Sequence, residues 1–284
     1  MTEFIVQHLS YSAVKQYCAN RYGFKRRYID GLYDDVIRPA GLIGQAGHLA
    51  LQRYVETKGD YAAAVNALEI HILSTPDAKI NWGKTGNREK CLKYARQGLD
   101  HYLNEVLIDF DKILGVELMM KQECAYKGVR IPMPLKCYSD KVILEIDDDG
   151  NKCLDIVDYK FKDKFSDMSL SNAAYTIQGM INMLCCHAEF GVAPRKITFR
   201  EIKVTMNRDG GSQIQDHTIY FNESHQDMIV FLNLLHQVLG ELDENNPRAA
   251  FLPNFWDFYD GQKAWDSFIE EMVDWGIPNF SEFY

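Results

Sequence analysis

No stretch of the sequence is apolar over the roughly 18 or more residues that a helix needs to cross a lipid bilayer. The N-terminus, MTEFIVQHLSYS, also lacks the basic segment followed by an apolar segment that marks a secretion signal. These two absences argue against a membrane-anchored or secreted protein. We therefore expect a cytoplasmic protein with no membrane partner.

Cysteine is sparse, and no two cysteines form a Cys-x-x-Cys pair. The seven cysteines stand at positions 18, 91, 124, 137, 153, 185 and 186. An odd number at irregular spacing argues for reduced thiols and against a zinc knuckle. We expect Cys185 and Cys186, adjacent on an apolar helix, to be small buried hydrophobic side chains.

Basic residues are nearly absent from the end of the chain. Residues 221–284 carry 2 basic and 12 acidic side chains, whereas residues 1–220 carry 29 and 28. The net charge of −9 therefore belongs to the C-terminal segment. Because the remainder is balanced and contains basic clusters, the local field and not the net charge decides whether a nucleic acid can bind.

What the sequence does contain is the patterning of a globular α/β protein, with 46% hydrophobic residues over 284 positions. Apolar residues at helical spacing predict helices over 10–22, 42–58, 60–73, 87–110, 171–190 and 223–242. Segments rich in β-branched and aromatic residues predict strands over 116–126, 141–147, 152–161, 196–206 and 212–221. These elements predict one mixed sheet flanked by helices, with a helical N-terminal part.

We assign residues 1–244 to a single domain and residues 245–284 to an acidic, aromatic appendage. Within the appendage, Trp265, Phe268 and Met272 share one face of a predicted amphipathic helix. Such a helix must bury its apolar stripe. It can do so on the same domain, on another protein or on a second copy of this chain.

Residues 78–85, AKINWGKT, resemble a nucleotide-binding phosphate loop in their Gly-Lys-Thr ending. A working loop leaves a buried strand and enters a helix, whereas this segment stands between two predicted helices. We therefore reject it and expect no ATP site. The segment is expected to be an exposed loop from which Trp82 and Lys84 can contact a ligand.

The most informative segment predicts a β-hairpin in which two aspartates converge. Residues 140–147 and 151–160 read as strands joined by a short loop that ends in Gly150. With a three-residue loop and a positive φ at Gly150, Asp140 falls opposite Asp158 on the same face. A two-residue loop would shift the register by one and place the two aspartates on opposite faces.

Alternation along the second strand puts Asp158 and Lys160 on one face and makes the other face apolar. Two carboxylates and a lysine then meet at one point of the sheet. Carboxylate oxygens bind hard cations such as Mg²⁺ or Mn²⁺, and an adjacent ammonium can orient water and offset phosphate charge. The alternative is an exposed hairpin with a surface salt bridge.

Several motifs, taken in order, resemble the PD-(D/E)XK nucleases, and in particular the RecB-like branch that includes CRISPR-adaptation and phage exonucleases. The matching pieces are LSYSAVKQYCANRYGFKRRYI at residues 9–29, GQAGHLAL at residues 44–51, Asp140, DYK at residues 158–160 and Gln178. The resemblance covers the chain from residue 9 to about residue 182. It implies a restriction-endonuclease-like core.

The resemblance also implies a set of site residues. The metal ligands would be His48, Asp140, Asp158 and the carbonyl of Tyr159, and the catalytic residues Asp140, Asp158 and Lys160. Gly44 and Gly47 in the helix of His48 cost about 1 kcal/mol each, which suggests that sheet or backbone approaches closely there. The alternative for His48 is a hydrogen-bonded histidine of the core.

DNA contacts are implied in the helix that follows the second strand. Gln178 matches the first position of the family's Gln-x-x-x-Tyr helix, but position 182 is Asn, and Tyr175 is the nearest substitute. Further candidate DNA contacts are Lys162, Lys84 and Trp82. Glu117 is similar to a family glutamate and is expected to have a supporting role.

Iron-sulfur members of this branch combine an early cysteine with three C-terminal ones, whereas Cys18 here has no cysteine partner beyond residue 186. We therefore expect no iron-sulfur cluster. The resemblance implies an Mg²⁺- or Mn²⁺-dependent deoxyribonuclease, an exonuclease on DNA ends in recombination, repair or phage DNA processing, in a bacterial or phage-infected cell. The alternative is a catalytically silent nuclease-fold module that binds DNA or protein.

Overall fold

The computed structural model describes residues 4–33, 36–84, 86–167, 173–207 and 210–243. The chain divides into two compact units, one formed by residues 1–33 and 232–284 and the other by residues 34–231. The predicted appendage, residues 245–284, and its amphipathic helix lie outside the described residues. Within the described ranges, a helix with the length and hydropathy of a membrane span is not found.

The described part of the smaller unit is mostly helical, and its first helix begins where the sequence predicts. Its elements are β1 (Leu9–Ser10), α1 (Tyr11–Ala19), α2 (Arg21–Phe24), the π-helix η1 (Lys25–Ile29) and the last part of α7 (His225–Glu241). Ser10 Oγ accepts a hydrogen bond from Ala13 N at 3.2 Å and so caps α1. The helix predicted over residues 10–22 is interrupted at Asn20, whose side chain caps α2. Glu241 is ion-paired with Arg21 at 3.0 Å.

The larger unit contains a layer of helices whose first turns are set by capping residues. These elements are α3 (Pro39–Glu56), α4 (Tyr61–Ser74), the 3-10 turn η2 (Asp77–Lys79), α5 (Arg88–Glu105) and the 3-10 turn η3 (Phe110–Lys112). Pro39 opens α3, where its missing N–H leaves no helical hydrogen bond unmade, and Asp60 and Asn87 cap α4 and α5. α5 ends before the predicted residue 110, because the backbone is extended at Val106.

The long strands lie where the sequence predicts them. The strands are β2 (Ile113–Gln122), β3 (Ala125–Tyr126), β4 (Val129–Arg130), β5 (Leu135–Ile146), β6 (Lys152–Lys162), β7 (Pro194–Lys203) and β8 (Ile214–Tyr220). The predicted strand 116–126 is divided into β2 and β3, and the short strand β4 was not predicted. β5 begins earlier than predicted, because residues 135–139 pair with β2. Helix α6 (Ala173–Phe190) separates β6 from β7, as predicted.

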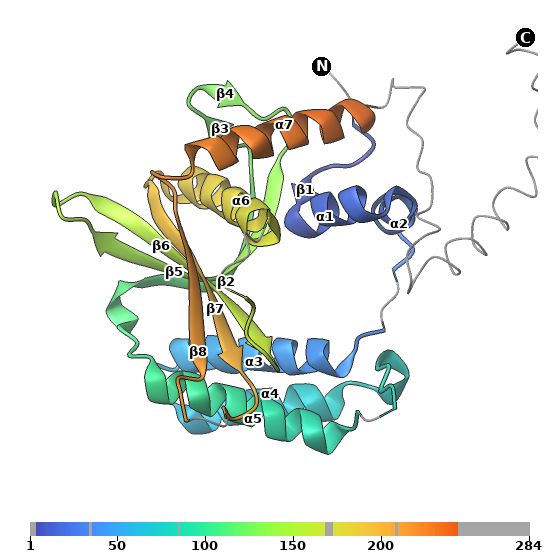
Figure 1. Cartoon of the computed structure of the whole chain (residues 1–284), viewed down its shortest axis with the longest axis vertical. Coiled ribbons are helices and arrows are strands. Elements are labelled where there is room, and N and C mark those ends of the chain that lie inside the picture. Colours follow the sequence, from blue (N-terminus) through green and yellow to red (C-terminus); the bar gives the residue numbers. More distant parts are fainter. Residues whose placement is uncertain (1–3, 34–35, 85, 168–172, 208–209, 244–284) are drawn as a thin grey trace, which may run out of the picture. The chain divides into compact units, whose positions relative to one another are not determined.

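The sheet of the larger unit is mixed. β5 is antiparallel to both β2 and β6, β6 is parallel to β7, and β7 is antiparallel to β8. A parallel pair needs a crossover connection, which α6 provides. In Figure 1, α6 covers one face of this sheet, and α3, α4 and α5 cover the other. The predicted α/β fold, with a mixed sheet flanked by helices and a helical N-terminal part, is confirmed.

The sheet and the helical layer meet most closely at Phe161 of β6. A Cβ added at Gly47 of α3 would lie 2.3 Å from Phe161 Cζ, and one added at Gly98 of α5 would lie 2.9 Å from Phe161 Cδ1. The prediction that the sheet approaches α3 is therefore confirmed at Gly47. It is wrong at Gly44, where an added Cβ would meet nothing within 4 Å.

The β5–β6 hairpin has the register of the three-residue loop. Asp147 N donates to Asn151 O at 2.9 Å, and φ at Gly150 is +83°. The residue pairs from Ile146–Lys152 to Lys141–Val157 keep this register. Asp140 and Asp158 are the next residues on the two strands and therefore face each other. The alternative two-residue loop is therefore wrong.

Candidate functional site

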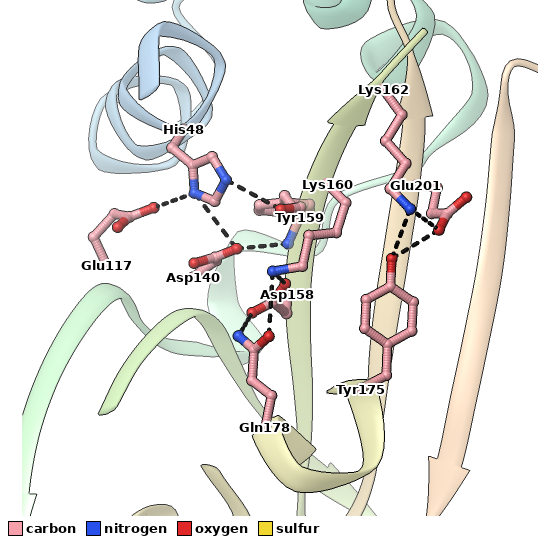
Figure 2. A network of polar contacts seen from close by, with 10 residues as sticks. All are labelled: His48, Glu117, Asp140, Asp158, Tyr159, Lys160, Lys162, Tyr175, Gln178 and Glu201. Carbon is pink, nitrogen blue, oxygen red and sulfur yellow. Dashed lines mark hydrogen bonds and ion pairs between the residues drawn. The ribbon is translucent and has the colours of Figure 1, made fainter. Parts of the chain in front are cut away.

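Asp140 and Asp158 lie on adjacent strands and are almost completely buried. Their exposed fractions are 7% and 2%. Asp140 Oδ2 accepts a hydrogen bond from the Tyr159 N–H at 2.5 Å, which holds this carboxylate against β6 (Figure 2). The alternative of an exposed hairpin with a surface salt bridge is wrong, because both carboxylates lie in the protein interior.

His48 reaches this part of the sheet from α3. Its Nδ1 lies 3.0 Å from Glu117 Oε1 and 3.4 Å from Asp140 Oδ2, and its Nε2 lies 3.1 Å from the carbonyl oxygen of Tyr159. Because oxygen acceptors face both ring nitrogens, the ring donates from both and carries a positive charge. Burial lowers the pKa of His48, but Asp140 and Glu117 outweigh this effect and raise the pKa to about 10.

Glu117 of β2 supplies another carboxylate to the same place. Its neighbours Val116 and Leu118 are paired with β5 on either side of Asp140, so Glu117 is level with Asp140. Its φ is +48°, in the left-handed region that residues other than glycine rarely adopt and that is enriched at functional sites. The sequence indicates only a supporting role for Glu117. The available signal is a single carboxylate within the apolar run GVELMM.

His48, Glu117 and Asp140 form a group that could hold a metal ion. Each offers one ligand atom, and these atoms lie within 4.8 Å of one another. Carboxylate oxygens suit Mg²⁺ and Mn²⁺, and an imidazole nitrogen is a further ligand for the transition ion. The positive charge of the His48 ring balances the negative charge of the two carboxylates. A divalent cation could provide this positive charge instead and displace the proton from the ring nitrogen. The donor set therefore fits a divalent metal.

Asp158 is surrounded by Lys160 and Gln178. Lys160 Nζ is ion-paired with Asp158 Oδ1, and Gln178 Nε2 donates to Asp158 Oδ2 at 2.5 Å (Figure 2). Burial and the charge of Asp140 raise the pKa of Asp158 to about 6, although Lys160 opposes them. Asp158 is therefore held partly toward its neutral form, because it is buried beside a second carboxylate.

A second polar network begins at Lys162, two residues further along β6. Lys162 Nζ lies 2.6 Å from Glu201 Oε1 and 3.0 Å from the Tyr175 hydroxyl, and Tyr175 donates to Glu201 Oε1 at 2.8 Å (Figure 2). Ser166 N donates to Glu201 Oε2 at 2.7 Å. Burial raises the pKa of Glu201, but Lys162 and Ser166 outweigh it and lower the pKa to about 2. No motif in the sequence singles out Glu201.

The remaining predicted DNA contacts, Trp82 and Lys84, belong to neither of these two clusters. Trp82 and Lys84 stand in the loop between α4 and α5, as predicted. Trp82 Nε1 donates to Asp77 Oδ1 at 3.2 Å, and the Arg88 guanidinium lies 5.7 Å from the centre of its ring. DNA binding by Trp82, Lys84, Lys162, Tyr175 and Gln178 stays a prediction.

The sequence analysis also singles out Asn182 and the adjacent residues Cys185 and Cys186. Asn182, where the family has Tyr, is 1% exposed, and its Nδ2 has no hydrogen-bond partner among the described residues. Cys185 and Cys186 are completely buried, as expected, and all seven cysteines are free thiols. The absence of an iron-sulfur cluster stays a prediction.

The mixed sheet and its buried cluster of carboxylates and lysine define an α/β protein with a charged site on its central strands. The family model of the PD-(D/E)XK nuclease superfamily matches residues 8–254. The chain belongs to this superfamily, and its fold is consistent with a restriction-endonuclease-like core. No curated protein matches the sequence. The solved structure described as "Crystal structure of SSO0001" is 14% identical over 87% of this chain and 89% of that chain, with a TM-score of 0.30.

Proposed function

We propose that this protein is a DNA nuclease of the RecB-like branch that requires Mg²⁺ or Mn²⁺ and acts as an exonuclease on DNA ends. The observation that carries the proposal is the convergence of His48, Glu117 and Asp140 beside the ion pair of Asp158 and Lys160. Membership of the nuclease superfamily supports the general activity. The end-directed mode rests on the resemblance of the motifs to exonucleases of that branch.

His48, Glu117 and Asp140 would hold the cation, and Asp158 and the carbonyl of Tyr159 are the further ligands that the resemblance implies. When bound, a divalent cation in such a site activates water at neutral pH and offsets charge on a phosphate oxygen. The α3 helix contributes to the site by bringing His48 against the sheet, which the close packing of Phe161 on this helix makes possible.

Lys160 would act as a fixed positive charge. Burial lowers the pKa of Lys160, but Asp158 outweighs this effect and raises it. The ammonium therefore stays protonated at neutral pH and does not serve as the base. Held by Asp158 and Gln178, it would stabilise the negative charge that develops on the phosphate during cleavage.

The test is a cleavage assay on end-labelled linear DNA and on covalently closed circular DNA of the same sequence, with Mg²⁺, with Mn²⁺ and with EDTA. We expect metal-dependent release of short products from the linear DNA and an intact circle. Nicking of the circle would contradict the end-directed mode. Absence of cleavage of either DNA by folded protein, with both metals, would contradict the nuclease function.

The matched control for this assay is the isosteric variant Asp158→Asn, purified in the same way. It removes the carboxylate charge and keeps the side-chain volume, so the protein should still fold. Residual activity equal to that of the wild type would show that the cleavage comes from a contaminant or from another site.

A further inference from the structure

Strands β2 and β5 form a ribbon, visible in Figure 1, whose solvent face carries two unusual cross-strand pairs. Met119 lies opposite Tyr138, and Lys121 lies opposite Lys136. Met119 and Tyr138 are 54% and 55% exposed, whereas the residues that alternate with them are buried or half-buried. Since side chains alternate along a strand, the four residues share one face.

The two lysines lack a carboxylate partner within the part of the chain that the structure describes. Like charges directly opposite each other in a sheet are destabilising. Among the described residues, no carboxylate forms an ion pair with Lys121 or Lys136. The acidic residue nearest in sequence, Glu123, is paired instead with Arg130 at 2.5 Å. The described residues therefore leave this pair of ammonium groups open to an external anion.

The exposed apolar pair stands between the lysines and the candidate metal group. Glu117 and Asp140 lie two residues from Met119 and Tyr138 along the same strands, which is about 7 Å. The lysine pair lies about 7 Å on the other side, and Lys136 Nζ is 5.5 Å from the centre of the Tyr138 ring. An exposed aromatic ring beside cations is how proteins bind single-stranded nucleic acids, with bases on the ring and phosphates on the cations.

A competing explanation is that lysines protect an edge strand from pairing with another protein molecule. Among the described strands, β2 pairs with β5 alone, so this explanation fits Lys121. It does not account for Met119 and Tyr138, because exposed apolar side chains near an edge promote association. The combination of apolar pair and lysine pair favours a ligand that has both flat apolar groups and negative charge.

We propose that this face of the ribbon binds a single DNA strand that leads into the candidate metal group. A base lies against Tyr138 and Met119, and backbone phosphates contact Lys121 and Lys136. The inference rests on the proposed function, since it takes the substrate to be DNA, and it adds the path of the strand beside the site.

The experiment measures binding of a fluorescent oligothymidylate by anisotropy, in EDTA so that the strand is not cut, over a range of salt concentrations. The variant is Lys121→Ala/Lys136→Ala, and the matched control is Lys93→Ala/Lys152→Ala, two exposed lysines elsewhere on the larger unit. We expect the first variant to bind more weakly and to reduce the slope of log K against log salt by about 1.4, for two contacts at roughly 0.7 each. The control should keep the wild-type slope.

Tyr138→Ala separates stacking from charge. We expect its affinity to fall about tenfold, as for the loss of one stacked base, with the salt slope unchanged. Removing the repulsion between the lysines should leave the melting temperature of the double variant equal to or above that of the wild type. A loss of affinity in this folded protein is then a binding effect.

Wild-type affinity and slope in the lysine variant, or an equal loss in its control, would overturn the inference. Aggregation of the lysine variant with unchanged DNA affinity would overturn it in favour of edge protection, and a change of oligomeric state alone would overturn it in favour of a protein interface. Different outcomes would contradict the proposed nuclease function. A protein that binds the strand through this face and cleaves no DNA refutes the nuclease function only, whereas cleavage with unaffected ribbon variants refutes the ribbon site only.

Discussion

Two polar clusters lie on the same strand, β6, and differ in how their charges are balanced (Figure 2). In one, Lys162 neutralises Glu201, and the pKa of Glu201 is lowered to about 2 by its hydrogen bonds. In the other, burial and Asp140 raise the pKa of Asp158 to about 6 although Lys160 is paired with it. Hydrogen bonds that favour the charged form of a buried carboxyl group stabilise the fold. A buried carboxyl group with a raised pKa is instead held toward its neutral form, and a bound cation would stabilise its charge.

The largest expected effect comes from Lys160→Ala. We expect the rate of DNA cleavage to fall by about a thousandfold or more, which corresponds to roughly 4 kcal/mol of transition-state stabilisation. The melting temperature should change little, because Asp158 can take up a proton when its partner is lost. Initial cleavage rates at saturating metal, with thermal unfolding of the same samples, measure both. A folded variant with full activity would remove Lys160 from the site.

Glu201→Gln should show the opposite pattern. We expect the free energy of unfolding at pH 7 to fall by about 3 kcal/mol, because Lys162 loses its buried partner, and cleavage at low temperature to fall far less than in Lys160→Ala. Urea denaturation measures the stability. A cleavage rate that falls as far as in Lys160→Ala, with an unchanged free energy of unfolding, would contradict the assignment of Glu201 to the fold.

The pH dependence of that loss follows from the pKa of Glu201, which is lowered from 4.5 to about 2 in the folded protein. A carboxyl with a lowered pKa stabilises the fold fully above its unfolded value and loses this contribution as the pH falls through the folded value. The stability difference between wild type and Glu201→Gln should therefore be largest above pH 4.5 and vanish toward pH 2. A constant difference over this range would show that Glu201 is not charged in the native state.

A smaller effect is expected in α3, which contributes to the site but not to the Lys162 network. Gly47→Ala should destabilise the protein by roughly 1–3 kcal/mol and weaken metal binding, since its Cβ would meet the Phe161 ring at 2.3 Å and displace His48. Gly44→Ala is the matched control in the same helix. Its Cβ meets nothing within 4 Å, so it should stabilise the protein by about 1 kcal/mol. Equal effects of the two variants, measured by urea denaturation, would contradict the close approach of sheet and helix.

The smallest expected change is in metal-induced stability. Excess Mn²⁺ should raise the melting temperature of the wild type by a few degrees, on the order of the linkage expected for about 1 to 2 kcal/mol, and should raise that of His48→Ala less. We expect His48→Ala to fold without metal. Failure to fold would support the alternative of a structural core histidine, and Glu117→Gln would then test the metal group with its shape preserved.

Much of the fold follows from patterns that are close together in the sequence. Strand alternation and the φ of Gly150 are local properties, and they predict that Asp140 faces Asp158 with Lys160 beside it. The cap at Ser10 likewise depends on the next few residues only. These features could be predicted because a short loop and a period of two leave few alternatives for the register.

The complete site depended on the tertiary structure. Glu117 meets His48 only because α3 packs on β6 where Gly47 admits the Phe161 ring, and Glu201 meets Lys162 only because β7 crosses over to lie parallel to β6. Residues that form these contacts are far apart in the chain, and the single carboxylate in each strand segment does not by itself indicate its partner. Packing between distant elements therefore decides which charges are neutralised inside the protein and which are left for a ligand. The reason is that burial and the distance to a partner set the energy of each charge.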